Sequence, residues 1–187
     1  MAYVSRGFIP VNNLVCCNTG LTKLFHIPAS NGTNTAIFDI VKAGSSGDAN
    51  GIPDCARITG INDVPVGVVV GFVADPSYLE QTYRTASTQR YALVNYDPNI
   101  VLVGQEDNAG AATLALSRLG TPVDVAVGSV DTVTGTSGMQ IGSGALVGAP
   151  GMFRLQQRSQ DPSNAAVGGA NTQWLVTFNV HQYKATT

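Results

Sequence analysis

The sequence predicts an all-β fold, a compact β-sandwich or small β-barrel of the jelly-roll-like or β-tulip-like kind, with long loops. The chain contains 22 valines, 9 isoleucines and 17 threonines among its 187 residues, and β-branched side chains pack better on a pleated sheet than on a helix. Glutamate and lysine, which usually fill helix surfaces, number only 2 and 3. The 21 glycines and 9 prolines mark frequent turns, which is typical of many short strands.

Strand-like segments follow one another along the chain, separated by turns. In the first half we expect strands within Leu21–Ile27, Thr35–Ala43, Ala56–Ile61 and Val66–Ala74. In the second half we expect them within Arg90–Tyr96, Ile100–Gln105, Ala111–Leu116, Val123–Val127, Met152–Gln157 and Gln173–Tyr183. The last segment alternates apolar and polar residues around Trp174, which predicts a half-buried strand.

The domain organisation expected is an irregular N-terminal arm, residues 1–20, followed by a single all-β domain, residues 21–187. The arm contains Pro10 and an Asn12–Asn13 pair, and its apolar residues include Tyr3, Phe8 and Ile9. One helix of two or three turns is expected after Asp75, because Pro76 suits a first helical position and Leu79 and Tyr83 are four residues apart.

Composition argues against several classes of partner. The net charge of −2 gives no positive field for nucleic-acid phosphates. The longest apolar run, Val66–Ala74, is too short to span a bilayer. The first residues lack the pattern of a secretory signal, so we expect the chain to remain in the cytoplasm where it is made. The cysteines, Cys16, Cys17 and Cys55, are odd in number and are expected to be reduced thiols.

No motif in the sequence indicates catalysis or a bound cofactor. Gly142–Gly148 is one residue too long for a dinucleotide fingerprint and precedes a proline instead of a helix. Gly135–Gly138 lacks the G-x-S-x-G pattern of a nucleophile elbow. His26 and His181 lie in strand-like segments and are expected to be sheet-face residues. We therefore predict a protein that is not an enzyme, with no catalytic residue and no cofactor.

Two acidic segments were considered as binding sites. Asp48–Asp54 carries three side-chain oxygens in a glycine-containing loop, which Ca²⁺ could accept, but it lacks the remaining ligands of an EF-hand. An Asx-rich turn is the favoured interpretation, and calcium remains an alternative. The neighbouring acids Glu106 and Asp107 are expected to form a solvated loop tip.

Several short segments carry a resemblance to a known family. They are Gly7–Val11, Phe25–Thr33, Ala36–Val41, Pro65–Phe72, Asp97–Glu106, Thr134–Gly138 and Asn179–Tyr183. With these segments the chain resembles the decoration, or cement, proteins that coat the heads of tailed phages, including those of cyanobacterial and marine podoviruses. The resemblance implies a β-rich subunit on the outer capsid surface of the virion. Such proteins are commonly trimeric and tie neighbouring subunits of the major capsid protein together, without catalytic residues.

The residues proposed for contacts with the capsid or with another protomer are apolar residues of the arm and of the segment after Asp75. They are Tyr3, Phe8, Ile9, Tyr78, Leu79 and Tyr83. A chain with so few charges is expected to expose apolar patches, and such patches favour association, here as a homotrimer. Two alternatives remain open: a carbohydrate- or receptor-binding module such as a phage adhesin domain, and a β-barrel enzyme with a dispersed site.

Overall fold

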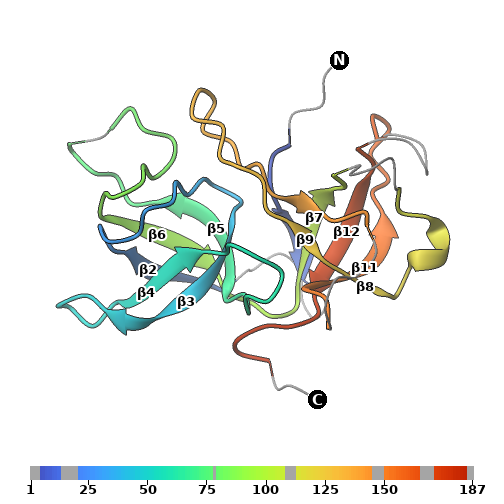
Figure 1. Cartoon of the computed structure of the whole chain (residues 1–187), viewed down its shortest axis with the longest axis horizontal. Helices are drawn as coiled ribbons and strands as arrows, with labels where there is room; N and C mark the ends of the chain where they lie inside the picture. The colour runs from blue at the N-terminus through green and yellow to red at the C-terminus, as the bar shows by residue number, and fades with distance from the viewer. Residues whose placement is uncertain are drawn as a thin grey trace.

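The computed structural model describes residues 5–13, 21–77, 79–107, 113–144, 150–164 and 171–184. The all-β class is confirmed, since the one helix in these ranges is the short 3-10 helix η2, Leu116–Arg118. Within the same ranges, no helix is long and apolar enough to cross a membrane. Of the β-sandwich and the small β-barrel that the sequence left open, the chain contains a small closed barrel. A five-stranded open sheet lies beside it along the longest axis (Figure 1).

The barrel is closed by five strands in the order β2-β4-β3-β5-β6. All neighbouring strands are antiparallel except β2 and β4, which meet in parallel at His26 and Asp54. The interior is filled by small and medium apolar side chains around Phe25. The strands are β2 (Thr22–Ile27), β3 (Ile40–Gly47), β4 (Pro53–Arg57), β5 (Gly67–Phe72) and β6 (Arg90–Asn95).

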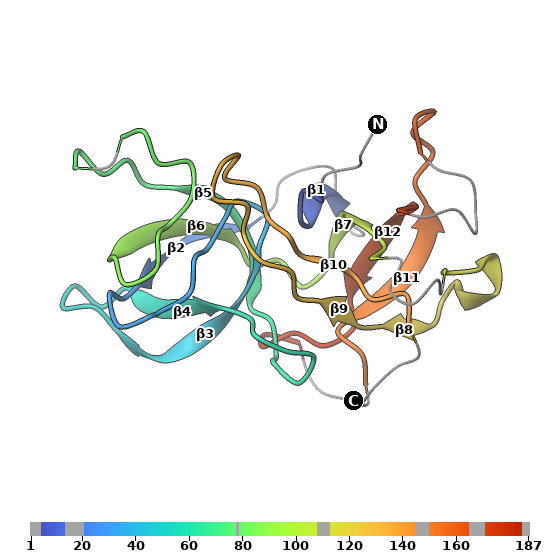
Figure 2. The same ribbon diagram turned by 45° about the horizontal axis from the view of Figure 1, so that its top comes forward.

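The open sheet is antiparallel and has the order β1-β7-β12-β11-β8. A short two-stranded ladder, β9 with β10, follows β8 in the chain (Figure 2). The strands are β1 (Ile9–Asn13), β7 (Ile100–Gln105), β8 (Pro122–Val123), β9 (Val125–Ala126), β10 (Gln140–Ile141), β11 (Phe153–Arg158) and β12 (Gln173–Phe178).

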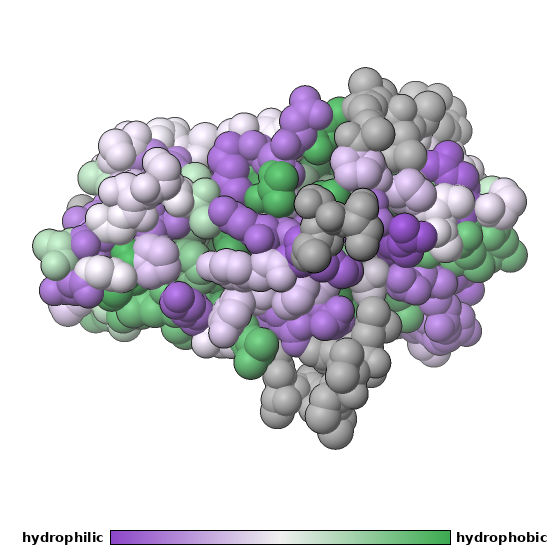
Figure 3. Space-filling view, turned by 90° about the horizontal axis from the view of Figure 1, so that it is seen from below, coloured by the Kyte–Doolittle hydropathy of each residue, from purple (hydrophilic) through white to green (hydrophobic). Residues whose placement is uncertain are grey.

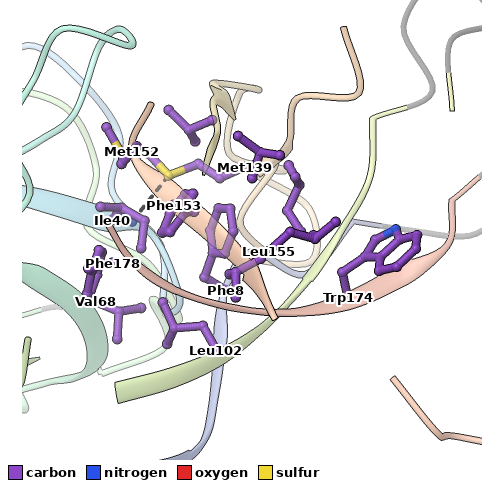
Figure 4. Close-up of a cluster of buried hydrophobic side chains, with 14 of the residues drawn as sticks. Phe8, Ile40, Val68, Leu102, Met139, Met152, Phe153, Leu155, Trp174 and Phe178 are labelled. Carbon is purple, nitrogen blue, oxygen red and sulfur yellow. Dashed lines mark hydrogen bonds between the residues drawn. The ribbon is translucent and has the colours of Figure 1, made fainter. Parts of the chain in front are cut away.

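One hydrophobic cluster joins the barrel to the sheet. Phe153 of β11 stacks on Phe8 with ring centroids 4.5 Å apart and on Phe178 of β12 at 5.5 Å. Ile40 of β3 and Val68 of β5 belong to the same cluster (Figure 4). Because barrel strands and sheet strands bury their side chains together, the two halves form one packed unit.

The prediction of an irregular N-terminal arm is wrong for the described residues 5–13. Ile9–Asn13 is strand β1, which pairs with β7, and Phe8 is 0% exposed in the shared core. Pro10 and a register shift before Asn12 conceal the strand pattern. Proline is tolerated there because β1 lies at the edge of the sheet.

The helix expected after Asp75 is absent from the described residues, which form turns. The Asp75 carboxylate accepts a hydrogen bond from the Ser77 N–H at 2.9 Å, which is a local turn. Farther along, the Arg90 guanidinium donates to the carbonyls of Gln81 and Tyr83. The strand expected within Ala111–Leu116 is also wrong for the described residues, 113–116, which precede and begin η2.

A buried ion pair ties the barrel to the segment between β9 and β10. The Arg57 guanidinium donates to both carboxylate oxygens of Asp39, at 2.8 and 3.1 Å, and to the Gly128 carbonyl at 2.5 Å. The Ser137 hydroxyl donates to the same carboxylate at 2.5 Å. Both charged side chains are buried, so each depends on the other for compensation.

Replacing Asp39 by alanine should lower the free energy of unfolding by about 3–5 kcal/mol, because Arg57 would remain buried without its counter-charge. The matched control is Lys42→Ala, which breaks the more exposed pair with Asp63 and should cost about 1 kcal/mol or less. Urea denaturation measures both. Equal losses in the two variants would show that the Asp39 pair has no special structural weight.

Candidate functional site

The loop between β5 and β6, residues 73–89 and here called the barrel-end loop, is held by the buried side chain of Arg84. Its guanidinium donates to four backbone carbonyls, those of Thr88, Thr33, Pro28 and Asn31, at 2.6–2.9 Å. Burial lowers the pKa of this guanidinium. No carboxylate of the described residues forms an ion pair with Arg84, so its role is to fix the path of the chain.

A second arginine fixes the outer part of the barrel-end loop. Arg90 lies 4.8 Å from the Phe72 ring centroid and donates to the Tyr83 carbonyl at 2.8 Å. Leu79 is nevertheless 73% exposed. A single exposed apolar side chain is common on protein surfaces, whereas a patch of several marks an association surface, so the neighbours of Leu79 decide its significance.

A turn from the other half of the chain lies beside this loop. The Asp131 carboxylate accepts hydrogen bonds from the Val133 and Thr134 N–H groups, and Val133 is 92% exposed. Gly135 has a positive φ of 71°, and a Cβ there would collide with the Thr82 side chain. Figures 1 and 2 show the two loops close together above the barrel.

These observations define one candidate surface, here called the loop-tip surface. It is formed by exposed or half-buried residues of the barrel-end loop and of the turn, namely Leu79, Glu80, Tyr83, Asp131 and Val133. Two isolated β-bridges hold these segments beside residues 35–37. The barrel-end loop is held by the bridge between Thr35 and Arg84, and the turn by the bridge between Ile37 and Thr136. The surface therefore combines aliphatic and acidic side chains on a fixed backbone.

The residues proposed from the sequence are divided between surface and core. Leu79 and Tyr83 lie in the loop-tip surface, and Ile9 is half-buried in β1. Phe8 was proposed as a contact, but that prediction is wrong because the ring is buried against Phe153. Tyr3 and Tyr78 lie outside the described residues. Sequence reasoning missed Val133, although a lone valine between Asp131 and Gly135 is an available signal for an exposed turn.

The outer wall of the barrel carries a histidine–aspartate pair. His26 Nδ1 lies 2.6 Å from Asp54 Oδ1, and the Nε2 atom is buried without a hydrogen-bond partner in the described residues. The Tyr91 ring lies 5.4 Å from the His26 ring. Cys55 follows Asp54 but is buried inside the barrel, and burial raises the pKa of its thiol to about 12, which keeps it protonated and unreactive.

The loop considered for calcium has the geometry of an Asx-rich turn. Asp48 accepts hydrogen bonds from the Asn50 and Ile52 N–H groups and from the Tyr91 hydroxyl, the last at 2.6 Å. The Tyr91 hydrogen bond is the main cause that lowers the pKa of Asp48 to about 2. In the part of the chain that the structure describes, no group of three or more His, Cys, Asp or Glu side chains could hold a metal ion.

The expectation that Glu106 lies in a solvated loop tip is wrong. Its side chain is buried, and one carboxylate oxygen accepts hydrogen bonds from the Trp174 indole and the Leu114 N–H, both at 3.1 Å. Burial raises the pKa of this carboxyl group. Trp174 itself is fully buried, as its alternating strand predicts, so its ring has no face available for stacking on a sugar.

Comparisons of this chain with protein-family models, with curated proteins and with solved structures found no match.

His181, expected on a strand face, instead lies in the turn after β12. Its ring is buried 5.1 Å from the Phe178 ring, and Nδ1 accepts a hydrogen bond from the Tyr183 N–H. Burial lowers the pKa of the imidazole from 6.5 to about 4. The unfolded chain therefore binds a proton at His181 between these two values, whereas the folded chain does not.

Stability should consequently fall as the pH drops below 6.5 towards 4. Between pH 7.5 and pH 5 this residue should cost about 2 kcal/mol of unfolding free energy. His181→Asn keeps an acceptor near the Nδ1 position and removes the titration, so the variant should lose correspondingly less. Urea denaturation at the two pH values measures the difference, and identical losses would assign the acid sensitivity to other groups.

Proposed function

We propose that this chain is a structural protein of the virion, not an enzyme, that decorates the outer surface of a phage capsid. The observation that carries the proposal is that ionisable side chains are bonded in the interior while aliphatic side chains are exposed at the surface. Buried ionisable groups such as Asp39, Arg57 and Arg84 are bonded within the chain, whereas aliphatic side chains project from fixed elements. Such a division favours binding to another protein over chemistry on a small molecule.

The contact with the shell is assigned to the edge strand β1. In the described part of the chain, β1 pairs with β7 on one side and has no partner strand on the other. An open edge can accept an extended segment of another protein by adding a strand to the sheet. Val11 on this strand is 47% exposed and supplies an apolar contact beside the backbone groups.

The proposed action is to cement neighbouring subunits of the major capsid protein. A protein that binds only the assembled shell stabilises it by mass action. In a homotrimer, the first docked subunit places the other two at high effective concentration, so modest contacts add up. The protein would be made in the host cytoplasm and would then reside on the head. The carbohydrate-binding alternative has less support because the single tryptophan is buried.

A substitution on β1 separates capsid binding from folding. Val11→Arg places a charge on the exposed edge and should weaken binding to phage heads about tenfold or more, since about 1.4 kcal/mol of lost contact suffices for that factor. The control is Val64→Arg, at a residue of similar exposure between β4 and β5, which should bind heads like the unmodified protein. Binding is measured by co-sedimentation with heads assembled without the protein.

Heads carrying the unmodified protein should also release DNA at a higher temperature than bare heads, and Val11→Arg should reduce this gain. The cement function fails if bare and fully decorated heads release DNA at the same temperature.

A further inference from the structure

The far end of the sheet carries a second exposed apolar surface, and this one is basic. Leu116 in η2 and Leu119 immediately after it are 54% and 40% exposed. Arg118 and Arg154 lie beside them, since Arg154 donates to the Gly120 carbonyl at 2.9 Å and Arg118 to the Thr121 hydroxyl at 3.3 Å. These four residues, Leu116, Arg118, Leu119 and Arg154, are here called the sheet-end surface.

The two arginines of the sheet-end surface form no ion pair with a carboxylate of the described residues. Their hydrogen-bond acceptors are neutral, namely backbone carbonyls, the Thr121 hydroxyl and the Asn179 amide. Among the described residues, the ion pairs involve other cations. Arg154 is exposed and Arg118 half-buried, and a guanidinium at the surface without an ion pair is available to an acidic partner.

The loop-tip surface has the complementary character. Leu79 and Val133 are its most exposed apolar residues, and Glu80 and Asp131 carry its negative charge. Arg84 of the barrel-end loop and Arg90 of β6 do not neutralise these acids, because Arg84 is buried among carbonyls and Arg90 lies against Phe72. Asp75 interacts electrostatically with Arg90, so it adds no uncompensated negative charge to this surface.

The two surfaces lie too far apart to meet within one molecule. The barrel-end loop is at the left end of the longest axis and η2 is at the right end (Figures 1 and 2). On the face shown in Figure 3, hydrophobic and hydrophilic residues again lie side by side at the right-hand end. At opposite ends of the chain, the acidic surface and the basic surface can contact each other only between neighbouring molecules (Figures 1 and 2).

We infer that the loop-tip surface of one copy binds the sheet-end surface of the next copy, head to tail. A contact of either surface with itself would bring like charges together, which is unfavourable. A head-to-tail contact either closes into a ring or continues as a filament. The closed trimer follows only if the proposed function is right, whereas the pairing of the two surfaces does not depend on it.

Charge reversal on each surface tests this contact. Glu80→Lys alters the loop-tip surface, and Arg118→Glu with Arg154→Glu alters the sheet-end surface. Glu80→Lys cancels the net negative charge of the loop-tip surface, and the two arginine substitutions place acidic side chains on both sides of the contact. Each change should raise the dissociation constant of self-association about tenfold or more. A chain carrying all three substitutions places a basic side chain at position 80 opposite acidic side chains at positions 118 and 154, and it should regain part of the association. Sedimentation velocity of the purified full chain at low salt measures association, and circular dichroism establishes that each variant is folded.

The matched control is Lys23→Glu, which reverses an exposed charge on β2 and should leave association unchanged. Leu79→Ser, which alters no charge, should weaken association by removing apolar contact, and it tests the surface even if an arginine variant is unstable. Association of the unmodified chain should also weaken as salt is raised towards roughly 1 M, where the Debye length is about 3 Å.

The inference is wrong if the unmodified chain is monomeric at low salt, or if the combined variant does not regain association. These outcomes are independent of the head-binding experiment. Heads stabilised by a monomeric chain would reject the head-to-tail contact alone. A chain that associates as described, without stabilising heads, would reject the cement function alone.

Discussion

The buried ion pair between Asp39 and Arg57 determines how the two halves of the chain are joined. Asp39 directly precedes β3 and also accepts a hydrogen bond from the Ala36 N–H at 2.7 Å, which closes the turn before the strand. Phe38 within that turn has a positive φ of 69°, a conformation that costs energy for a bulky residue. Its carbonyl accepts a hydrogen bond from the Phe8 N–H. The N-terminal segment is therefore bonded to Phe38, and the segment from Gly128 to Ser137 is bonded to the neighbouring Asp39–Arg57 pair, so both join the barrel at the start of β3.

The low share of charged residues has a structural explanation in this arrangement. Several of the few basic side chains interact within the chain: Arg57 with a carboxylate, Arg84 with four carbonyls, and Arg90 with an aromatic ring and carbonyls. Buried arginines of this kind fasten long loops that lack regular backbone pairing, because a guanidinium offers five donors in a fixed plane. The loops can then present leucine and valine to solvent without collapsing onto the core. The buried arginines thus hold in place the loops that expose these aliphatic side chains.

The local sequence pattern was sufficient to predict the regular strands but not the irregular segments that connect them. The segments that became β5, β6 and β7 are runs of apolar and β-branched residues with turns on both sides, and they were predicted within one or two residues. The segment Thr35–Ala43 forms a strand only from Ile40, because Phe38 and Asp39 serve the turn. Barrel closure between His26 and Asp54, and the proximity of Gly135 to Thr82 in the barrel-end loop, are long-range contacts that no local pattern contains.

The topology also explains why the two proposed contacts use different parts of the molecule. A closed barrel has no free strand edges, so its only means of association are side chains on its wall and loops. The open sheet has two edges, and β8 is just two residues long, with Pro122 as one of them, which protects that edge. The edge at β1 also contains a proline, Pro10, but it has five residues, so the proposed strand addition is assigned to β1. Contacts through loop tips and contacts through an edge therefore do not compete, and one chain could bind a neighbouring copy and a shell subunit at the same time.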